Sequence, residues 1–270
     1  MICALLIGRD GSRGFPGKNL APVLGRPMMA YPLLAARHAP SVQRIYLSTD
    51  SRKIYEVGTQ YGARHIPRPP ELSTAEALGE EVFAHGYRFI RSELEAEGES
   101  LELLVLLFCN APTITADHIE AGIRILRERP ELDSAVSVSA YNMWSPLRAR
   151  KTGKDGLLHP FVPIEAIGDP TTLNCDRDSQ GDVLFADMSV SVVRPRCLEK
   201  IELGLLPQRW MGQKIYPLQQ WGGCDVDYAW QVAGVVHWLE AHGFSNEKTP
   251  YDESLERVRI NGGSEPEGKS

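Results

Sequence analysis

The sequence lacks the features of a membrane protein, a disulfide-rich protein or a zinc–thiolate protein. No apolar run approaches the roughly 20 residues of a membrane helix, and the N-terminus shows no basic region and cleavage site of a secretory signal. Its cysteines are odd in number, widely separated and without a Cys-x-x-Cys pair. These absences predict a cytoplasmic protein. The cysteines are Cys3, Cys109, Cys175, Cys197 and Cys224.

Positive charge is outnumbered by negative charge, since 29 Lys and Arg stand against 35 Asp and Glu, which gives a net charge of −6 and a pI near 5.7. Such an acidic balance argues against nucleic acid and favours a small-molecule partner. The length of 270 residues, with 43% hydrophobic and 24% charged residues, is typical of one enzyme-sized domain. We expect this domain to span residues 1–243, with an arm inserted at about 142–187 and a flexible tail at 244–270.

Two common phosphate-binding motifs are missing. The glycines are spaced Gly8-x-x-Gly11-x-x-Gly14, which is not the dinucleotide fingerprint and argues against an NAD(P)-dependent oxidoreductase. A P-loop would need glycine at Ser12 and a hydroxyl residue at Asn19. The seven histidines are scattered and suggest no nucleophilic triad.

What the sequence does have is a cationic, glycine-rich stretch directly after its first apolar run. The run 3–8 predicts a buried strand, and residues 9–19 cannot continue it because they contain glycines and a proline. The glycines allow a ligand to approach the backbone closely, while the cations favour an anion. A polyphosphate site is therefore predicted; the alternative is a surface turn with solvated basic side chains. The polar residues are Arg9, Ser12, Arg13, Lys18 and Asn19, and the glycines after Gly8 are Gly11, Gly14 and Gly17.

Strand and helix patterns alternate through the first half of the chain. This alternation predicts an α/β fold with a mostly parallel, doubly wound sheet. The segment 142–187 contains four prolines and no helical period, so we interpret it as a lid or as an arm that contacts another subunit. The predicted strands are 3–8, 44–49, 63–66, 103–108, 134–141 and 190–193, and the predicted helices are 27–37, 52–61, 76–94, 115–129 and 225–243.

Asp225 and Asp227 form a second polar motif. In an extended segment, residues two apart project to the same side, so both carboxylates can face one divalent cation such as Mg²⁺. The alternative is that Asp227 caps the last helix and Asp225 is solvated. Further polar groups, in 48–50 and at Asn110, follow apolar strands and so are expected at the ligand-binding edge of the sheet.

These motifs, in this order, resemble the acylneuraminate cytidylyltransferase family, which also contains the 3-deoxy-manno-octulosonate enzymes. The stretch 8–19 is similar to that family's Ala-Arg-Gly-Gly-Ser-Lys-Gly-x-Pro-x-Lys-Asn. Further matches are Gly25-Arg-Pro27 with Tyr31, Ser48-Thr-Asp50, Tyr61-Gly-Ala63, Arg68-Pro69 with Leu72, and Asp225-Val-Asp227.

The resemblance implies a Rossmann-like nucleotidyltransferase fold with a protruding dimerisation arm. It implies that Arg9, Arg13 and Lys18 act in catalysis, that Asp225 and Asp227 hold Mg²⁺, and that the arm builds a homodimer. It also implies a nucleotide site for CTP, formed by Gly8, Arg9, Gly11, Ser12, Arg13, Lys18, Asn19 and Arg68.

The sequence departs from the family pattern in the acceptor half. Where the family has Gln-x-Thr-Ser-Pro-Leu-Arg this chain has 108–114, with Phe108 and Ile114 at the ends, and Asp187-Met188 replaces Asn-Gly. The polar residues left to contact an acceptor are Asn110, Gln180 and Asp187.

We therefore expect a Mg²⁺-dependent cytidylyltransferase that joins an acidic, nonulosonic-acid-like sugar to CMP with release of pyrophosphate. The alternatives are a non-sialic acceptor such as a phosphonate, and a nucleotide-binding homologue without activity.

Overall fold

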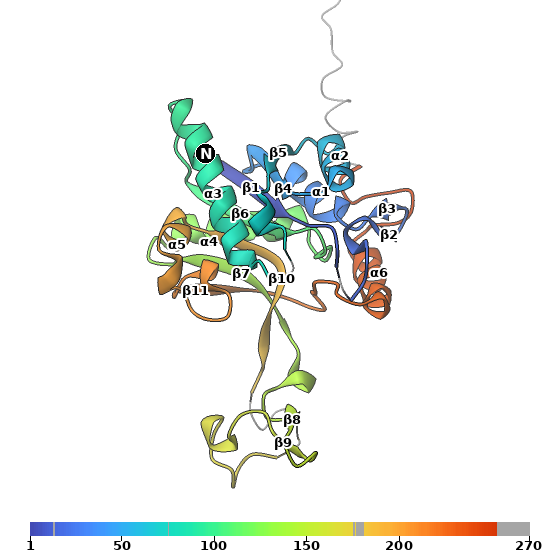
Figure 1. Cartoon of the computed structure of the whole chain (residues 1–270), viewed down its shortest axis with the longest axis vertical. Helices are drawn as coiled ribbons and strands as arrows, with labels where there is room; N and C mark the ends of the chain where they lie inside the picture. Colours follow the sequence, from blue (N-terminus) through green and yellow to red (C-terminus); the bar gives the residue numbers. More distant parts are fainter. Residues whose placement is uncertain (13, 75, 175, 177–180, 253–270) are drawn as a thin grey trace, which may run out of the picture.

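The computed structural model is built on one seven-stranded sheet in the order β11-β7-β10-β6-β1-β4-β5 (Figure 1). It describes residues 1–12, 14–74, 76–174, 176 and 181–252. All neighbouring strands are parallel except β10, which runs antiparallel to both β6 and β7. The predicted mostly parallel α/β sheet is confirmed. The strands are β1 (Ile2–Ile7), β4 (Arg44–Thr49), β5 (Arg64–Pro67), β6 (Leu103–Phe108), β7 (Ser134–Ala140), β10 (Leu184–Val193) and β11 (Ile215–Gln220).

Helices cover both faces of the sheet. Strand β1 is buried on both sides: Ile2, Ala4 and Leu6 pack with α1, α2 and α4, while Cys3 and Leu5 pack with α3 and α5. This two-sided burial explains why the strand reads as a continuous apolar run. No helix in the described part of the chain is long and apolar enough to cross a bilayer. The helices are α1 (Ala30–His38), α2 (Arg52–Gln60), α3 (Gly79–Ala96), α4 (Ala116–Glu128), α5 (Pro195–Glu199) and α6 (Val232–Ala241).

The first predicted helix begins later than the sequence suggested. Residues 26–27 form strand β3 (Arg26–Pro27), which pairs with β2 (Pro22–Val23), because Leu24 and Gly25 adopt positive φ angles of 43° and 73° and reverse the chain. Helix α1 then starts at Ala30. Pro32 lies in its first turn, where a backbone N–H has no partner within the helix.

The last predicted helix is also shorter. Helix α6 begins at Val232 rather than at Asp225, and it packs with the β2–β3 hairpin around Trp238 in a separate apolar cluster. The segment after α6 packs on the same cluster, since Phe244 is buried and the Tyr251 hydroxyl accepts a hydrogen bond from the Ala116 N–H at 3.0 Å. Residues 244–252 therefore pack on the body, contrary to the predicted tail, and residues 253–270 of that prediction lie outside the described residues.

The inserted segment protrudes from the body of the molecule (Figure 1). It carries a small hairpin of β8 (Arg150–Thr152) and β9 (Leu158–Pro160), which the sequence did not predict. Strand β10 begins at Leu184, six residues before the predicted start, and its pairing with β7 is interrupted between Ala186 and Ser191.

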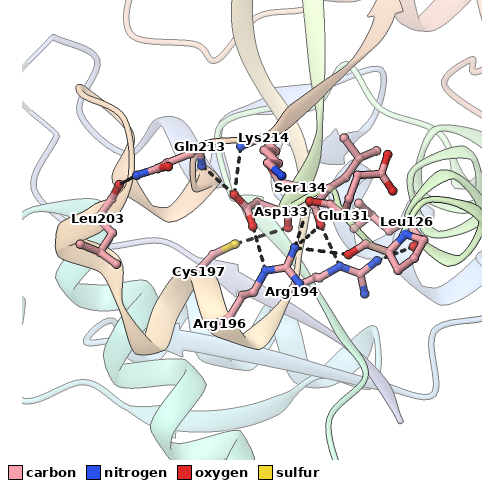
Figure 2. Close-up of polar contacts among 12 residues, drawn as sticks. Leu126, Glu131, Asp133, Ser134, Arg194, Arg196, Cys197, Leu203, Gln213 and Lys214 are labelled. Carbon is pink, nitrogen blue, oxygen red and sulfur yellow. Dashed lines mark hydrogen bonds and ion pairs between the residues drawn. The ribbon is translucent and has the colours of Figure 1, made fainter.

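Asp133 lies at the end of the sheet where β7 and β11 begin and β10 ends, and it forms hydrogen bonds with the segments next to β10 and β11 (Figure 2). Its carboxylate accepts hydrogen bonds from the backbone N–H groups of Gln213 and Lys214, each at 2.9 Å, and from Arg196 Nε at 2.8 Å. Its carbonyl accepts from the Arg194 N–H. Burial alone would raise the pKa of Asp133, but these donors hold it below the ordinary value of 3.8.

Candidate active site

A cleft of about 400 Å³ lies at the carboxyl ends of β1 and β6. This is the edge at which open parallel sheets bind ligands. The loop after β1 and the segment after β5 supply most of its polar wall, and helix α3 contributes Gly79 and Val82. The lining residues are Ile7, Gly8, Arg9, Ser12, Gly14, Lys18, Asn19, Arg68, Leu72, Ala77, Gly79, Val82, Phe108, Asn110, Asp227 and Tyr228.

Glycines allow the loop to pack closely on its surroundings. A Cβ on Gly8 would lie 2.4 Å from Cys109 Sγ, and a Cβ on Gly14 would lie 2.6 Å from the Asp227 carbonyl oxygen. Both distances are too short for any side chain, so the loop after β1 lies directly against the segment of Asp227 and Tyr228. The phosphate loop and the carboxylate pair, predicted separately from the sequence, form one site.

Arg68 points a fixed cation into the cleft. Its Nη2 donates to the Ser48 carbonyl oxygen at 2.5 Å and its Nε donates to Ser48 Oγ at 3.3 Å. Burial lowers the pKa of this guanidinium, with Asp50 acting in the opposite direction. A guanidinium remains charged in proteins, so Arg68 supplies a positive charge together with N–H groups beyond those bound to Ser48.

Asn19 offers a buried acceptor. Its Nδ2 donates to the Arg9 carbonyl oxygen at 3.0 Å, while its Oδ1 is buried and has no donor among the described residues. A buried acceptor without a partner is costly, and a hydroxyl or amino group of a ligand would satisfy it.

Lys18 and Asp227 both line the cleft and form an ion pair, with Lys18 Nζ 2.5 Å from Asp227 Oδ1. Asp225 lies deeper. Its own burial and then the charge of Asp227 raise the pKa of Asp225, while Lys18 acts in the opposite direction. The N-cap of α6 is Gln231, and the N-cap of the short helix before it is Tyr228, so Asp227 is not the helix cap of the alternative interpretation.

The carboxylate pair fits a divalent cation that is shared with a phosphate ligand. No group of three or more His, Cys, Asp and Glu side chains in the described residues is placed to hold a metal. Mg²⁺ is commonly bound through one or two carboxylates plus substrate phosphates and waters, which is what Asp225 and Asp227 beside the loop can provide.

Most of the predicted site residues meet in this cleft. Gly8, Arg9, Ser12, Lys18, Asn19, Arg68, Asn110 and Asp227 line it. Gly11 and Asp225 do not line it. Gly11 belongs to the same loop, and the charge of Asp227 raises the pKa of Asp225 after the larger effect of burial. Arg13 and Gln180 lie outside the described residues.

Asp187 is not at the cleft, contrary to its predicted contact with the acceptor. It is 4% exposed and lies in a buried polar network. Ile114, predicted to replace a cation at the acceptor, is fully buried in the apolar core below the sheet edge. Phe108, in contrast, does line the cleft and packs its ring edge-on against Phe83 at 5.2 Å.

The sequence analysis did not predict that Tyr228, or Val82 of α3, would line the cleft. Tyr228 is 55% exposed, and its ring lies beside Gly14. Its position directly after the Asp-x-Asp motif is a signal that would have placed it at the site.

Comparisons with known proteins agree with this architecture. A model of the cytidylyltransferase family matches residues 3–138. The N-acylneuraminate cytidylyltransferase of Escherichia coli O18:K1:H7 is 27% identical over 141 residues, which are 52% of this chain and 32% of that protein. The CMP-N,N'-diacetyllegionaminic acid synthase of Legionella pneumophila is 40% identical over 75 residues, 27% of this chain and 32% of that protein. The match thus covers about a third of each relative.

A solved structure shares the fold over most of the chain. A CMP:2-keto-3-deoxy-manno-octonic acid synthetase superposes with a TM-score of 0.60 at 15% identity, covering 89% of this chain and 98% of that one. The family model covers half of the sequence and includes β1, the loop after it, Arg68 and β6. The chain belongs to the cytidylyltransferase family.

Proposed function

We propose that the protein is a cytidylyltransferase that activates an acidic sugar with CTP and releases pyrophosphate. The observation that carries the proposal is the meeting of Arg9, Lys18 and Arg68 with Asp227 in one cleft at the carboxyl edge of the sheet. The curated relatives are named for the activation of sialic, legionaminic and pseudaminic acids, and this supports an acidic sugar as the acceptor.

In the proposed reaction an acceptor oxygen forms a bond to the α-phosphorus of CTP, and the bond between the α-phosphorus and the bridging oxygen of the β-phosphate breaks. Pyrophosphate leaves with the electron pair, and the acceptor proton passes to solvent or to a base. Lys18, Arg9 and Arg68 would offset the charge that develops on the phosphate oxygens. The predicted role of Arg13 in catalysis and in binding CTP remains a prediction from the sequence.

We propose Mg²⁺ as the metal. Bound, it would neutralise phosphate charge and polarise the phosphoryl oxygens. Asp225 and Asp227 would hold it, and Lys18 keeps Asp227 oriented toward the loop. The donor set of two carboxylates beside a cationic phosphate loop supports this choice over a thiolate-binding metal.

A homodimer built by the protruding arm and a cytoplasmic location are part of the same proposal. The arm supports the homodimer, because it protrudes from the body (Figure 1) and carries large apolar side chains that are exposed. Met143, Trp144, Leu157, Leu158 and Phe161 are between 52% and 73% exposed. Such a concentration of apolar surface is typical of a protein interface.

Pyrophosphate release tests the proposal. The purified chain is incubated with CTP, Mg²⁺ and a panel of acceptors, namely N-acetylneuraminate, a diacetamido nonulosonate, 3-deoxy-manno-octulosonate and small phosphonates. We expect release with at least one acidic sugar and none without acceptor. Pyrophosphate release with phosphonates alone would show that the acceptor is a phosphonate and not an acidic sugar. Binding of CTP without pyrophosphate release under any condition would favour a homologue without activity.

A further inference from the structure

Asp187 is a buried carboxylate that does not line the cleft. It lies on β10 and is 4% exposed. All its hydrogen-bond donors are neutral groups. They are Ser137 Oγ at 2.5 Å, Ser139 Oγ at 2.8 Å, Gln220 Nε2 at 2.9 Å and the Ser189 N–H at 3.2 Å.

The carboxylate fixes the direction of the hydrogen bonds around it. The Ser139 hydroxyl donates its proton to Asp187 Oδ2, because a carboxylate oxygen accepts. The lone pairs of Ser139 Oγ are then free to accept, and they take the Gly223 N–H at 3.0 Å. This relay, a chain of two hydrogen bonds, connects Asp187 through Ser139 to the backbone of Gly223. Residue 223 must be glycine, because a Cβ there would lie 2.2 Å from Asp187 Oδ2.

Gly223 begins the segment 223–227, which carries the two carboxylates of the site. Three of its residues are held through both backbone groups. The Gly223 carbonyl accepts from Tyr141 Oη at 2.8 Å. The Cys224 N–H donates to Thr113 Oγ1 at 2.9 Å and its carbonyl accepts from the same hydroxyl at 3.3 Å. Val226 exchanges two hydrogen bonds with Asn110.

We propose that Asp187 is a positioning residue, which acts through Ser139 on the backbone of Gly223 to hold the 223–227 segment, and so Asp225 and Asp227, at the cation site. This inference rests on the proposed function, since it concerns the carboxylates that would hold Mg²⁺. It assigns Asp187 to the geometry of the cation site rather than to the acceptor. Gln220, on β11, supports the same network from the other side by donating to Asp187 and to Ser189 Oγ.

The test measures metal affinity apart from nucleotide affinity. Mn²⁺ is titrated into the full chain with saturating CTP and no acceptor, and free Mn²⁺ is followed by electron paramagnetic resonance; CTP affinity is measured without metal by calorimetry. Ser139→Ala breaks the relay, and Tyr141→Phe removes the donor to the Gly223 carbonyl at a less buried position. Each should raise the Mn²⁺ dissociation constant about fivefold to tenfold, the effect of one lost hydrogen bond, and leave metal-free CTP affinity unchanged.

Ser134→Ala is the matched control. Ser134 lies on the same strand, is equally buried and donates to the Met211 carbonyl oxygen, far from Asp187. It should leave Mn²⁺ affinity unchanged. Wild-type Mn²⁺ affinity in Ser139→Ala, or an equal loss in the control, would overturn the positioning role. If the unaltered chain binds no Mn²⁺ with CTP, the proposed function fails as well, so the two failures are distinguishable.

Discussion

Lys18 and Asp227, which are 209 residues apart in the chain, form an ion pair of 2.5 Å between Nζ and Oδ1. The lysine is mostly buried, with 13% of its side chain exposed, whereas the aspartate is 59% exposed. The contact joins the loop after β1 to the segment before α6. It therefore brings the cationic loop and one carboxylate of the Asp225–Asp227 pair together in one cleft.

Removal of either carboxylate should impair the reaction. Asp225→Asn and Asp227→Asn are each expected to lower kcat by about 10- to 100-fold at saturating CTP and Mg²⁺, because a charge-assisted contact is worth roughly 1.5–3 kcal/mol. Steady-state kinetics measure this. Glu56→Gln, in an exposed ion pair with Arg52, is the control and should be neutral. Full activity in both aspartate variants would contradict the proposal that Asp225 and Asp227 hold Mg²⁺.

Arg68 should not be replaceable by lysine. The guanidinium contacts two atoms of Ser48 at once, and an ammonium group cannot reproduce this fork. Arg68→Lys is expected to weaken CTP binding by about tenfold in calorimetry at fixed ionic strength, the loss of one such contact. Arg52→Lys, at a side chain that is 89% exposed, is the matched control. Equal CTP affinity in both variants would remove Arg68 from the nucleotide site.

Gly14→Ala should separate the loop from the carboxylate segment, because the new methyl group would lie 2.6 Å from the Asp227 carbonyl oxygen. A displacement of this kind is expected to lower kcat/KM for CTP on the order of 10- to 100-fold. Gly234→Ala is the control: nothing lies within 4 Å of its added methyl, and alanine in helix α6 should raise the free energy of unfolding by about 0.5–1 kcal/mol. Unchanged kinetics in Gly14→Ala would show that the two segments are not in close contact.

Asp133 should stabilise the fold in a pH-dependent way. Its pKa is lowered in the folded state, so its contribution is present above the ordinary value of 3.8 and is lost as the pH falls through the folded value. Asp133→Asn is expected to reduce the free energy of unfolding at pH 7 by about 1–3 kcal/mol, since it leaves a donor unsatisfied.

Denaturant unfolding at pH 7, 5 and 3.5 measures this effect. The difference between Asp133→Asn and the wild type should hold from pH 7 to 5 and shrink below about 3.8. Asp155→Asn, at a half-exposed carboxylate of the arm, should change stability little. A difference that grows on acidification would contradict the assignment of Asp133 as the ionised acceptor.

Phe108 should disfavour N-acetylneuraminate as the acceptor. An apolar ring lines the cleft where the resembling family has glutamine, so the polar groups of that sugar lack a partner there. Phe108→Gln is expected to raise kcat/KM for N-acetylneuraminate by about tenfold and to cost stability, because the ring packs on Phe83 and Trp210. If the wild type uses N-acetylneuraminate better than the other acceptors, this interpretation of Phe108 is wrong.

The elements that the sequence predicted well are those whose signal is local. Strands β4 and β6 match their predicted ranges because continuous apolar runs bounded by polar residues are typical of buried parallel strands. Strand β11 escaped prediction because it is an edge strand that contains Pro217 and two glutamines, so neither alternation nor a long apolar run marks it.

The motifs of the candidate site could be predicted from the sequence, but the hydrogen bonds that hold its residues in place could not. The loop after β1 and the Asp225–Asp227 pair are recognised from their own residue types, and the structure brings the loop and Asp227 into one cleft. The role of Ser48 in holding Arg68 and of Ser139 in holding Gly223 depends on contacts between segments 20 and 84 residues apart. The prediction that Asp187 contacts the acceptor has the same origin, because nothing in its sequence neighbourhood shows that four donors from three strands surround it.

The transfer of the cytidylyl group itself tests the central claim most directly. CTP labelled at the α-phosphorus is incubated with the protein, Mg²⁺ and each acidic sugar, and the products are separated and counted. We expect the label to appear in a CMP–sugar conjugate with one pyrophosphate released per conjugate, and to be lost in Asp227→Asn. Label that stays in CTP, or that appears only in free CMP with every acidic sugar tested, would contradict the proposed function.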